Sequence, residues 1–322
     1  MLVTGAGGFI GSHLVEQLAR AGAIVRAFVR YNSRNDHGWL EALDDDLLAS
    51  VDVFRGDLVN PEAALGAVDG CDTVFHLGAL IPIPYSYRHP REFVDANVAG
   101  TLNVLEASRR HRTRRIVHTS TSEVYGTARV VPIDEEHPLQ AQSPYAATKI
   151  AADQLALSFT RSFDLPVVVA RPFNTFGPRQ SARAVIPTII TQALSFQRIE
   201  IGSLEPTRDF VYVSDTAAGL IACGEAPGIE GEVINLGTGV EISIGSLIET
   251  ISRIASVEAA VVSVDERRRP RRSEVERLVA NADKARTVLG WTPQVELEEG
   301  LRRTVEWTRS ALQTYKPGLY QI

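Results

Sequence analysis

Tyr145 and Lys149 stand four residues apart in an alanine-rich segment. On a helix, residues four apart share one face, so the two side chains would lie side by side. A free phenol titrates at about pH 10 and is a weak base near neutrality, whereas a neighbouring ammonium stabilises the phenolate and lowers its pKa. Such a pair can exchange a proton with a hydroxyl while a nicotinamide takes or gives a hydride. The spacing predicts a catalytic redox centre at Tyr145 and Lys149, both also in contact with the cofactor.

Three more polar residues, Thr121, Ser122 and Glu123, follow the short β-branched run Arg115–Ser120. If that run is a strand of a parallel sheet, they project from its carboxyl end, where ligands of such sheets bind. Thr121 can hydrogen-bond a reacting hydroxyl, and Glu123 is a candidate acid or base beyond the Tyr–Lys pair. We therefore place all three in the catalytic site. The alternative is a capped strand end with a solvated glutamate.

A glycine-rich segment lies between the first expected strand and the first helical pattern. Its glycines allow a tight turn and a close approach to a pyrophosphate, while the following helix directs its positive end at that anion. A strand before and a helix after are the context that a dinucleotide-binding motif requires. We expect cofactor contacts from Gly5, Gly8, Phe9, Ile10 and Gly11.

The second expected strand indicates which dinucleotide binds. An acidic residue at its end would accept a hydrogen bond from a ribose hydroxyl, but Arg30 stands there instead, and arginine suits a 2′-phosphate. Arg30 therefore favours NADP over NAD; the alternative is that it is a solvated loop charge. Further cofactor contacts are expected at later strand ends, from Asp57, Leu58, Leu77 and Ala79, with Asp57 towards the adenine amino group.

Short β-branched runs alternate with helical patterns over the first two-thirds of the chain. The expected helices are Ser12–Ala21, Glu92–Arg110 and Pro144–Phe163. This alternation predicts an α/β fold with a Rossmann-like, doubly wound parallel sheet. The expected strands are Leu2–Thr4, Ile24–Val29, Val51–Arg55, Thr73–Leu77, Arg115–Ser120 and Val167–Arg171.

The C-terminal third consists of short segments broken by Gly and Pro, such as Glu232–Leu236, Val257–Val264 and the helix Leu297–Tyr315. It predicts a smaller C-terminal substrate-binding lobe packed on the sheet edge. We therefore divide the chain into a cofactor-binding Rossmann domain, residues 1–175, and a mainly substrate-binding lobe, residues 176–322. Sheet and helix segments of the first domain return around residues 208–238.

Composition excludes several classes of function. A net charge of −6 over 322 residues does not predict a nucleic-acid partner, because phosphate neutralisation needs a basic face. Cys71 and Cys223 have no metal-ligand spacing, so we expect neither a metal nor a disulfide framework. No apolar run reaches the roughly 18 residues of a membrane span, and no leader segment is recognisable. We therefore expect no membrane partner and a cytoplasmic location.

Together the motifs resemble the extended short-chain dehydrogenase/reductase family, the NAD(P)-dependent nucleotide-sugar epimerases and dehydratases. The resemblance covers nearly the whole chain. It is carried by the glycine loop, Thr121, Tyr145 with Lys149, Arg171-Pro172-Phe173-Asn174 with Gly177-Pro178, Arg208–Val213 with Asp215, and Asn235-Leu236-Gly237.

The resemblance implies a nucleotide-diphosphate sugar as substrate and a tightly bound cofactor that is regenerated in each cycle. It also implies that Arg208 and Arg271 clamp the diphosphate, with Asn174 near the phosphates and Tyr85 in contact with the substrate. The helices Glu92–Arg110 and Pro144–Phe163 form a dimeric four-helix bundle in this family, so a homodimer is expected.

The Thr-Ser-Glu triplet is similar to that of GDP-mannose 4,6-dehydratases, and Ser-Glu-Val-Tyr-Gly is shared with UDP-glucuronate decarboxylases. Simple C4-epimerases usually have a small residue where Glu123 stands, and dTDP-glucose dehydratases have Asp where Ser122 stands. Three further segments, residues 28–40, 83–87 and 273–278, look most like dehydratases of bacterial legionaminic-acid-type pathways, whose substrate is a nucleotide-linked N-acetylglucosamine.

These features imply a nucleotide-sugar 4,6-dehydratase acting on a UDP- or GDP-linked N-acetylglucosamine or related hexose to give a 4-keto-6-deoxy sugar. In that reaction Tyr145 takes the C4 hydroxyl proton and Glu123 removes the C5 proton. Decarboxylation of a UDP-glucuronate, C4 epimerisation and a non-catalytic cofactor-sensing protein remain alternatives.

Overall fold

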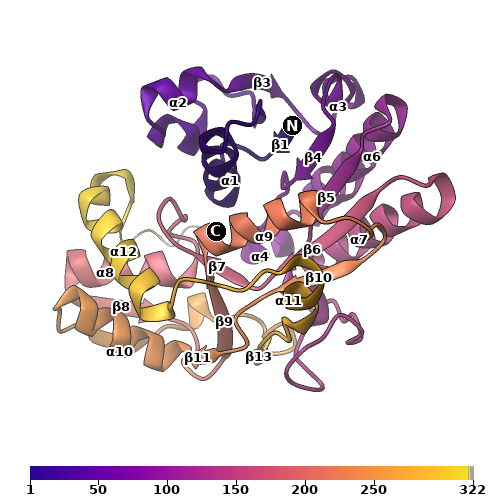
Figure 1. Cartoon of the computed structure of the whole chain (residues 1–322). Coiled ribbons are helices and arrows are strands. Elements are labelled where there is room, and N and C mark those ends of the chain that lie inside the picture. The colour runs from indigo at the N-terminus through magenta and orange to yellow at the C-terminus, as the bar shows by residue number, and fades with distance from the viewer. Residues whose placement is uncertain (318, 320–322) are drawn as a thin grey trace.

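Seven parallel strands form the central sheet of the computed structural model, which describes residues 1–317 and 319 (Figure 1). The first strand lies inside the sheet, and the chain adds strands on one side of it before crossing to the other. This is the predicted Rossmann-like doubly wound sheet, with its switch point between β1 and β4. In spatial order the strands are β10 (Val233–Leu236), β6 (Val167–Pro172), β5 (Arg115–Thr119), β4 (Thr73–His76), β1 (Leu2–Thr4), β2 (Arg26–Arg30) and β3 (Asp52–Gly56).

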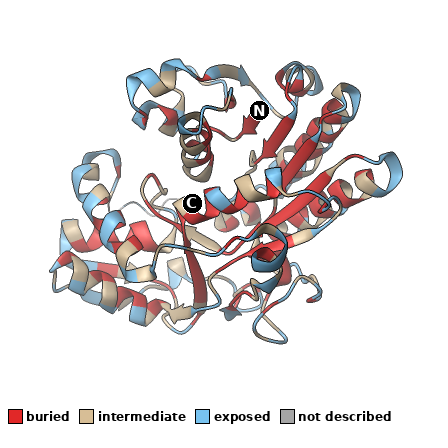
Figure 2. Cartoon of the chain, in the orientation of Figure 1, coloured by how far each residue is buried: buried red, intermediate tan, exposed pale blue. Residues whose placement is uncertain are grey.

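Burial explains the composition of these strands. Every residue of β4 and β6 is buried, because helices cover both faces of a parallel sheet (Figure 2). Neighbouring residues alternate between the two faces, so Leu2 and Val3 enter different cores. The bounds of β1 are those that the sequence predicted, and the ends of the other predicted sheet strands differ from the observed ones by at most two residues. Ile24, for example, precedes β2 and is 88% exposed.

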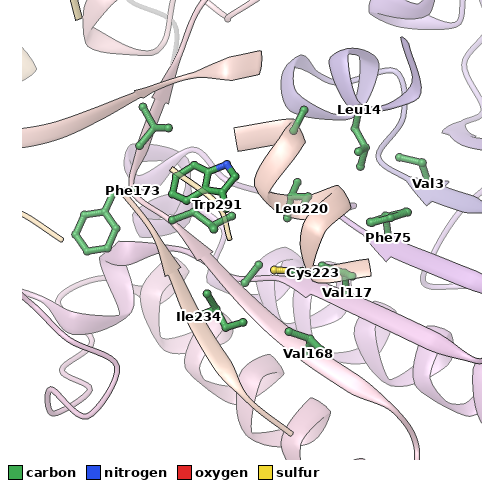
Figure 3. Close-up of a cluster of buried hydrophobic side chains, with 14 of the residues drawn as sticks. Val3, Leu14, Phe75, Val117, Val168, Phe173, Leu220, Cys223, Ile234 and Trp291 are labelled. Carbon is green, nitrogen blue, oxygen red and sulfur yellow. The ribbon is translucent and has the colours of Figure 1, made fainter. Parts of the chain in front are cut away.

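One face of the sheet is covered by α1 (Phe9–Arg20) and α9 (Val213–Glu225), which pack on each other. The core beneath them includes Leu14, Phe75 and Leu220 (Figure 3). The other face is covered by three helices that pack in sequence: α3 (Pro61–Val68), α6 (Gly100–His111) and α7 (Pro144–Phe163). The bounds of α7 are those that the sequence predicted.

The expected helix Glu92–Arg110 is interrupted. It is divided into α5 (Pro90–Phe93), a π-helical turn η2 (Val94–Ala99) and α6. The turn carries the buried Asn97, whose side chain accepts from the Leu80 N–H at 2.7 Å and donates to the Leu80 carbonyl at 2.9 Å and to Thr148 Oγ1 at 3.1 Å. The irregular turn thus aims one amide at the segment after β4 and at α7, a use typical of π-turns near functional sites.

The smaller lobe has its own core, which includes Phe176, Ile189, Phe210 and Leu247. A four-stranded sheet and a two-stranded sheet are covered by three helices, with α10 and α12 side by side in orange and yellow in Figure 1. The elements are β7 (Asn174–Phe176), β9 (Thr207–Tyr212), β11 (Glu241–Ser243), β13 (Arg277–Leu278), β8 (Arg198–Ile201), β12 (Ala260–Ser263), α8 (Val185–Phe196), α10 (Ile244–Ala255) and α12 (Leu297–Ser310).

Shorter elements connect these layers. The last predicted helix, Leu297–Tyr315, ends at Ser310 and is followed by a separate 3-10 turn. The remaining elements are η1 (Gly38–Ala42), α2 (Asp45–Ala49), α4 (Ile83–Arg88), η3 (Ser122–Tyr125), η4 (Asp265–Arg267), α11 (Asp283–Leu289) and η5 (Leu312–Thr314).

Polar and aromatic contacts join the lobe to the cofactor-binding half. Arg179 Nη2 donates to Glu16 on α1 at 2.7 Å. The ring of Trp39, in the segment after β2, meets Trp307 of α12 edge to face at 5.3 Å between centroids. Both cysteines are buried and free, and among the described residues no helix could span a bilayer and no cluster of acidic, His and Cys side chains suits a metal.

Candidate active site

A cavity of about 950 Å³ opens at the carboxyl ends of the sheet strands and extends to the smaller lobe. Its walls come from the glycine loop, the segments after β2, β4 and β5, the start of α7, and the loops around β9 and η4. This volume is at the upper end of the range for small-molecule sites. The cavity lies where doubly wound sheets bind their ligands.

The glycine loop is shaped for close backbone approach. Gly5 has a φ of +69°, and a Cβ there would meet the Gly78 nitrogen at 2.9 Å. A Cβ on Gly11 would lie 2.2 Å from the Gly5 carbonyl oxygen, so the turn and the start of α1 can pack only without side chains. Gly5, Gly8, Phe9, Ile10 and Gly11, all predicted cofactor contacts, line the cavity. The free N–H groups of the first turn of α1 suit a pyrophosphate.

The outer wall is formed by the segment after β2. Arg30, Asn32 and Asp36 line the cavity there. The Asp36 carboxylate accepts from Asn32 Nδ2 and the Gly38 N–H, both at 3.3 Å. The backbone of this segment packs closely on the glycine loop: a Cβ on Gly38 would lie only 2.4 Å from the Gly7 carbonyl oxygen. Asp36 is an acidic group on this wall that the sequence analysis did not single out.

Two of the predicted adenine-side residues lie outside the cavity wall. Asp57 is exposed and accepts from the Val59 N–H at 3.0 Å, and Leu58 packs on Gly78. Leu77 and Ala79, after β4, do line the cavity.

The turn after β4 is fixed by Thr4. The Thr4 hydroxyl accepts from the Leu77 and Gly78 N–H groups at 3.1 and 3.0 Å. His76 is buried and bonds Thr4 and Thr101 through its two ring nitrogens, at 2.8 and 3.0 Å, so both nitrogens have a partner. Buried polar side chains therefore fix the backbone of Leu77 and Gly78, beside the proposed cofactor site.

Tyr145 and Lys149 both line the cavity and are buried on α7. Burial raises the pKa of the Tyr145 phenol; a hydrogen bond with the Thr121 side chain opposes this rise, and the Glu123 and Asp153 carboxylates add to it. The lowered phenol pKa expected from Lys149 is therefore wrong for the protein alone. A positively charged nicotinamide beside the phenol would supply the opposite charge that lowers its pKa.

Lys149 is held as a partly desolvated ammonium. Its Nζ donates to the Thr119 carbonyl oxygen at 2.7 Å. Burial lowers the pKa of Lys149 from 10.5 to about 8, although the Asp153 carboxylate one turn further along α7 acts in the other direction. The side chain is thus cationic at neutral pH and loses its charge in a mildly alkaline range.

The lowered pKa of Lys149 predicts how kcat/KM depends on pH in the alkaline range. If the Lys149 cation is needed, kcat/KM should fall as pH rises through about 8, where the ammonium is lost. The decline should approach tenfold per pH unit well above the pKa of a single required cation. A pH–rate profile of the holoenzyme measures it, with Lys149→Arg as the control that keeps its charge. A flat profile from neutral to strongly alkaline pH would contradict this role.

A buried network of charged and polar side chains joins α7 to the strands β5 and β6. Asp153 Oδ2 accepts from Ser120 Oγ at 2.8 Å and from Arg171 Nη2 at 3.1 Å. Arg171 Nη1 also donates to Tyr125 at 2.9 Å. His118 Nε2 lies 3.3 Å from the other Asp153 oxygen. Breaking a buried ion pair typically costs about 3–5 kcal/mol, so this network fixes the helix that carries Tyr145 and Lys149.

The carboxyl end of β5 brings Thr121, Ser122 and Glu123 into the cavity wall. Thr121 caps the 3-10 turn η3, its hydroxyl accepting from the Glu123 N–H at 3.2 Å. The Glu123 side chain is only 13% exposed and lies 3.6 Å from Arg269 Nη1. Glu123 is therefore a largely buried carboxylate that acts on the phenol of Tyr145 together with Asp153.

The structure brings only some of the predicted substrate contacts together. Asn174 and Arg208 line the cavity. Tyr85 and Arg271 do not: the Tyr85 hydroxyl donates to Glu92 at 2.8 Å, and Arg271 is exposed.

Tyr87 and Arg269 line the cavity, whereas the predicted Tyr85 and Arg271 do not. Each is two residues from a predicted contact in the same segment. The orientation of the short helix α4 and of the turns after η4 selects them, and no local periodicity in the sequence reveals that orientation.

The sequence and the fold of the whole chain can both be compared with those of known proteins. The sequence profile of the GDP-mannose 4,6-dehydratase family matches residues 2–304. The chain belongs to this family. It is a member of the short-chain dehydrogenase/reductase group, an NAD-dependent nucleotide-sugar dehydratase or epimerase.

The relatives of this chain have several different activities. A UDP-glucose 4-epimerase of Mycolicibacterium smegmatis is 35% identical over 97% of this chain and 99% of its own. A dTDP-glucose 4,6-dehydratase of Streptomyces niveus is 34% identical over 98% of this chain and 95% of its own. Among other relatives is a UDP-glucuronic acid decarboxylase. The family is thus established, whereas the reaction differs among its members.

One solved relative contains both a nucleotide sugar and NAD. MoeE5 in complex with UDP-glucuronic acid and NAD superposes with a TM-score of 0.86 at 32% identity, covering 96% of this chain and 99% of its own. Its bound NAD supports NAD use by this family member, whose glycine loop and α1 fit a pyrophosphate as described above.

Proposed function

We propose that this protein is a nucleotide-sugar 4,6-dehydratase that converts a UDP- or GDP-linked N-acetylglucosamine, or a related hexose, to its 4-keto-6-deoxy sugar. The observation that carries the proposal is the Glu123 carboxylate, which lines the same cavity as Tyr145 and is largely buried. Oxidation at C4, and hence epimerisation, needs the Tyr–Lys pair alone. Elimination across C5 and C6 needs a second group to remove the C5 proton, and we assign that role to Glu123.

The residues of the chain divide the work as follows. Tyr145 accepts the C4 hydroxyl proton, with Thr121 bonded to its phenol and Lys149 cationic behind it. A nicotinamide cofactor, which the glycine loop would hold, would supply reversible hydride chemistry at the sugar. Once C4 is a ketone, the C5 proton is acidified and Glu123 removes it. Arg208, buried at the lobe side of the cavity, is a cationic ligand for the substrate diphosphate.

The test is incubation of the holoenzyme with UDP-N-acetylglucosamine, GDP-mannose, dTDP-glucose, UDP-glucose and UDP-glucuronate, followed by mass spectrometry. Loss of water from a UDP- or GDP-linked hexose is the expected result. Loss of carbon dioxide from UDP-glucuronate would identify a decarboxylase, and conversion without a change of mass an epimerase; either result alone would overturn the proposal. A protein that binds cofactor and converts none of the five would be a cofactor sensor. The resemblance to legionaminic-acid-type dehydratases makes UDP-N-acetylglucosamine the first substrate to try.

We further propose a preference for NADP, as Arg30 predicted. Arg30 lines the cavity, where a guanidinium would attract a 2′-phosphate. Asp36 lines the same wall and acts in the opposite sense, because its carboxylate would repel that phosphate. Titration of the purified protein with NAD and NADP, repeated on Arg30→Ala, measures the balance. Tighter binding of NAD by the unchanged protein would refute the preference.

We also propose that the protein is a homodimer joined by a four-helix bundle of α6 and α7 with their copies. Leu102 on α6 and Phe163 at the end of α7 are apolar and exposed in the single chain, at 38% and 47%. Light scattering on the purified protein tests the state, and a monomer at working concentration would exclude it. The cytoplasmic location stays a prediction from the sequence.

A further inference from the structure

The outer wall of the cavity, formed by the segment after β2, packs directly on the glycine loop. Asn32, Asp36 and His37 line the cavity on this wall, as Gly7 does on the glycine loop. A Cβ on Gly7 would lie only 2.5 Å from the His37 carbonyl oxygen, so the two backbones are in close contact. A dinucleotide held by the glycine loop would therefore be bordered by this wall.

The outer wall begins with a local turn. Asn32 Oδ1 accepts from the Arg34 N–H at 3.0 Å, and Asn32 Nδ2 donates to the Asp36 carbonyl oxygen at 2.9 Å. These bonds shape the turn but do not attach it to the glycine loop. An attachment follows at Trp39, whose N–H donates to the Gly7 carbonyl oxygen at 2.9 Å. The backbone of Trp39 thus ties the outer wall to the cofactor loop.

The side chain of Trp39 extends this connection to the substrate lobe. Its ring meets the ring of Trp307 on α12 edge to face, with 5.3 Å between the centroids and 71° between the planes. Both side chains are partly buried. Aromatic pairs in this arrangement stabilise a contact beyond the apolar area that they bury. Trp39 therefore bonds the glycine loop through its backbone and contacts the substrate lobe through its ring.

Trp307 is itself fixed by the lobe. Leu301 and Val305 of the same helix are buried in the lobe core. On the other side, the ring of Tyr315 meets Trp307 edge to face at 6.0 Å between centroids. The Tyr315 hydroxyl donates to the carbonyl oxygen of the cavity-lining Gln180 at 2.9 Å. The position of the Trp307 indole is therefore set by the substrate lobe and not by the cofactor-binding half.

We propose that Trp307 is a positioning residue for the cofactor: acting through Trp39, it holds the outer wall on the glycine loop and slows release of the dinucleotide. The substrate lobe thus has a second role, which is to retain the cofactor. Retention suits dehydration, epimerisation and decarboxylation alike, because each of these reactions leaves the cofactor in its starting redox state. The inference therefore goes beyond the proposed dehydration and does not depend on it.

The test measures cofactor release in the absence of any nucleotide sugar. The protein is loaded with NADH or, in parallel, with NADPH, and is mixed with an excess of the oxidised form while nicotinamide fluorescence is recorded. Trp307→Leu and Trp39→Leu should each release the cofactor about tenfold faster, the order of effect expected for one aromatic pair and its buried area. The double variant should be no faster than either single variant, because both substitutions remove the same contact.

A rescue variant and a control accompany these measurements. Trp307→Phe should recover most of the slow release, because a phenyl ring can still meet Trp39 edge to face. Phe196→Leu removes a ring of the same lobe that is 53% exposed and outside the cavity wall, and it should leave release unchanged. Circular dichroism checks that each variant is folded. If Trp307→Leu does not fold, Trp39→Leu tests the same contact from the cofactor-binding side.

Three results would overturn the inference. Unchanged release in Trp307→Leu, together with a lowered melting temperature, would show that Trp307 serves only to stabilise α12. Faster release in Trp307→Leu but not in Trp39→Leu would show that Trp307 does not act through Trp39. Additive effects in the double variant would show that the two rings act independently. Because no sugar is present, these outcomes are distinct from failure of the proposed dehydration.

Discussion

Tyr145→Phe should lower kcat by about 10³-fold, within the range of roughly 10²–10⁴ for removing a general acid–base group. The phenol, which hydrogen-bonds with the Thr121 side chain, is the proposed proton acceptor for the C4 hydroxyl. The phenyl ring keeps its edge-to-face contact with Phe93, 6.3 Å between centroids, so folding should be preserved. The measurement is single-turnover reduction of the bound cofactor on mixing with the nucleotide sugar.

A matched control is Tyr31→Phe, which removes a phenol hydroxyl from a residue that is 72% exposed and outside the cavity wall. It should leave the rate unchanged. Tyr31→Phe should leave cofactor affinity unchanged, and Tyr145→Phe should lower it only modestly, because the glycine loop is the proposed pyrophosphate site. If Tyr145→Phe reduced its cofactor at the rate of the unchanged protein, another group would have to accept the C4 proton.

Glu123→Gln should abolish water release and leave oxidation at C4 in place, so that reduced cofactor accumulates on the enzyme. The amide keeps the size of the side chain but cannot accept the C5 proton. The reaction should therefore stop at the ketone, with water release lowered by 10³-fold or more, of the order expected for an essential base. Absorbance of the reduced nicotinamide and mass spectrometry of the sugar measure the two halves separately.

The control is Glu276→Gln, an exposed glutamate of the same lobe that lies outside the cavity wall. It should turn over normally. Unchanged water release in Glu123→Gln would remove Glu123 from the elimination and leave the reaction to be explained by Tyr145 alone. Loss of both C4 oxidation and water release would instead indicate that Glu123 is needed to bind the sugar.

Much of the site could be predicted because its spacing is local. Tyr145 and Lys149 share a face of one helix whatever surrounds it. The glycine loop needs only the strand before it and the helix after it. Alternating strands and helices dictated a parallel sheet, and its carboxyl edge dictated where Thr121 and Glu123 would meet the redox pair.

Other features depend on parts of the chain that are distant in sequence. Asn97 acts through a π-helical turn that interrupts an apparently regular helical pattern. The phenol of Tyr145 is buried by several elements at once, and that burial raises a pKa that the helix alone predicted to be lowered. Both effects arise from packing, which periodicity in the sequence does not describe.

The sequence by itself determined the fold class of this family member and predicted that the glycine loop and the Tyr–Lys pair share one site, because each follows from spacing within one or two elements. Only the tertiary structure decided that Arg269 rather than Arg271 faces the cavity, that Tyr87 rather than Tyr85 lines it, and that Glu123 is largely shielded from solvent beside a cation. The reason is that the direction of a loop side chain, and the electric field around a carboxylate, are set by groups brought together from opposite ends of the chain.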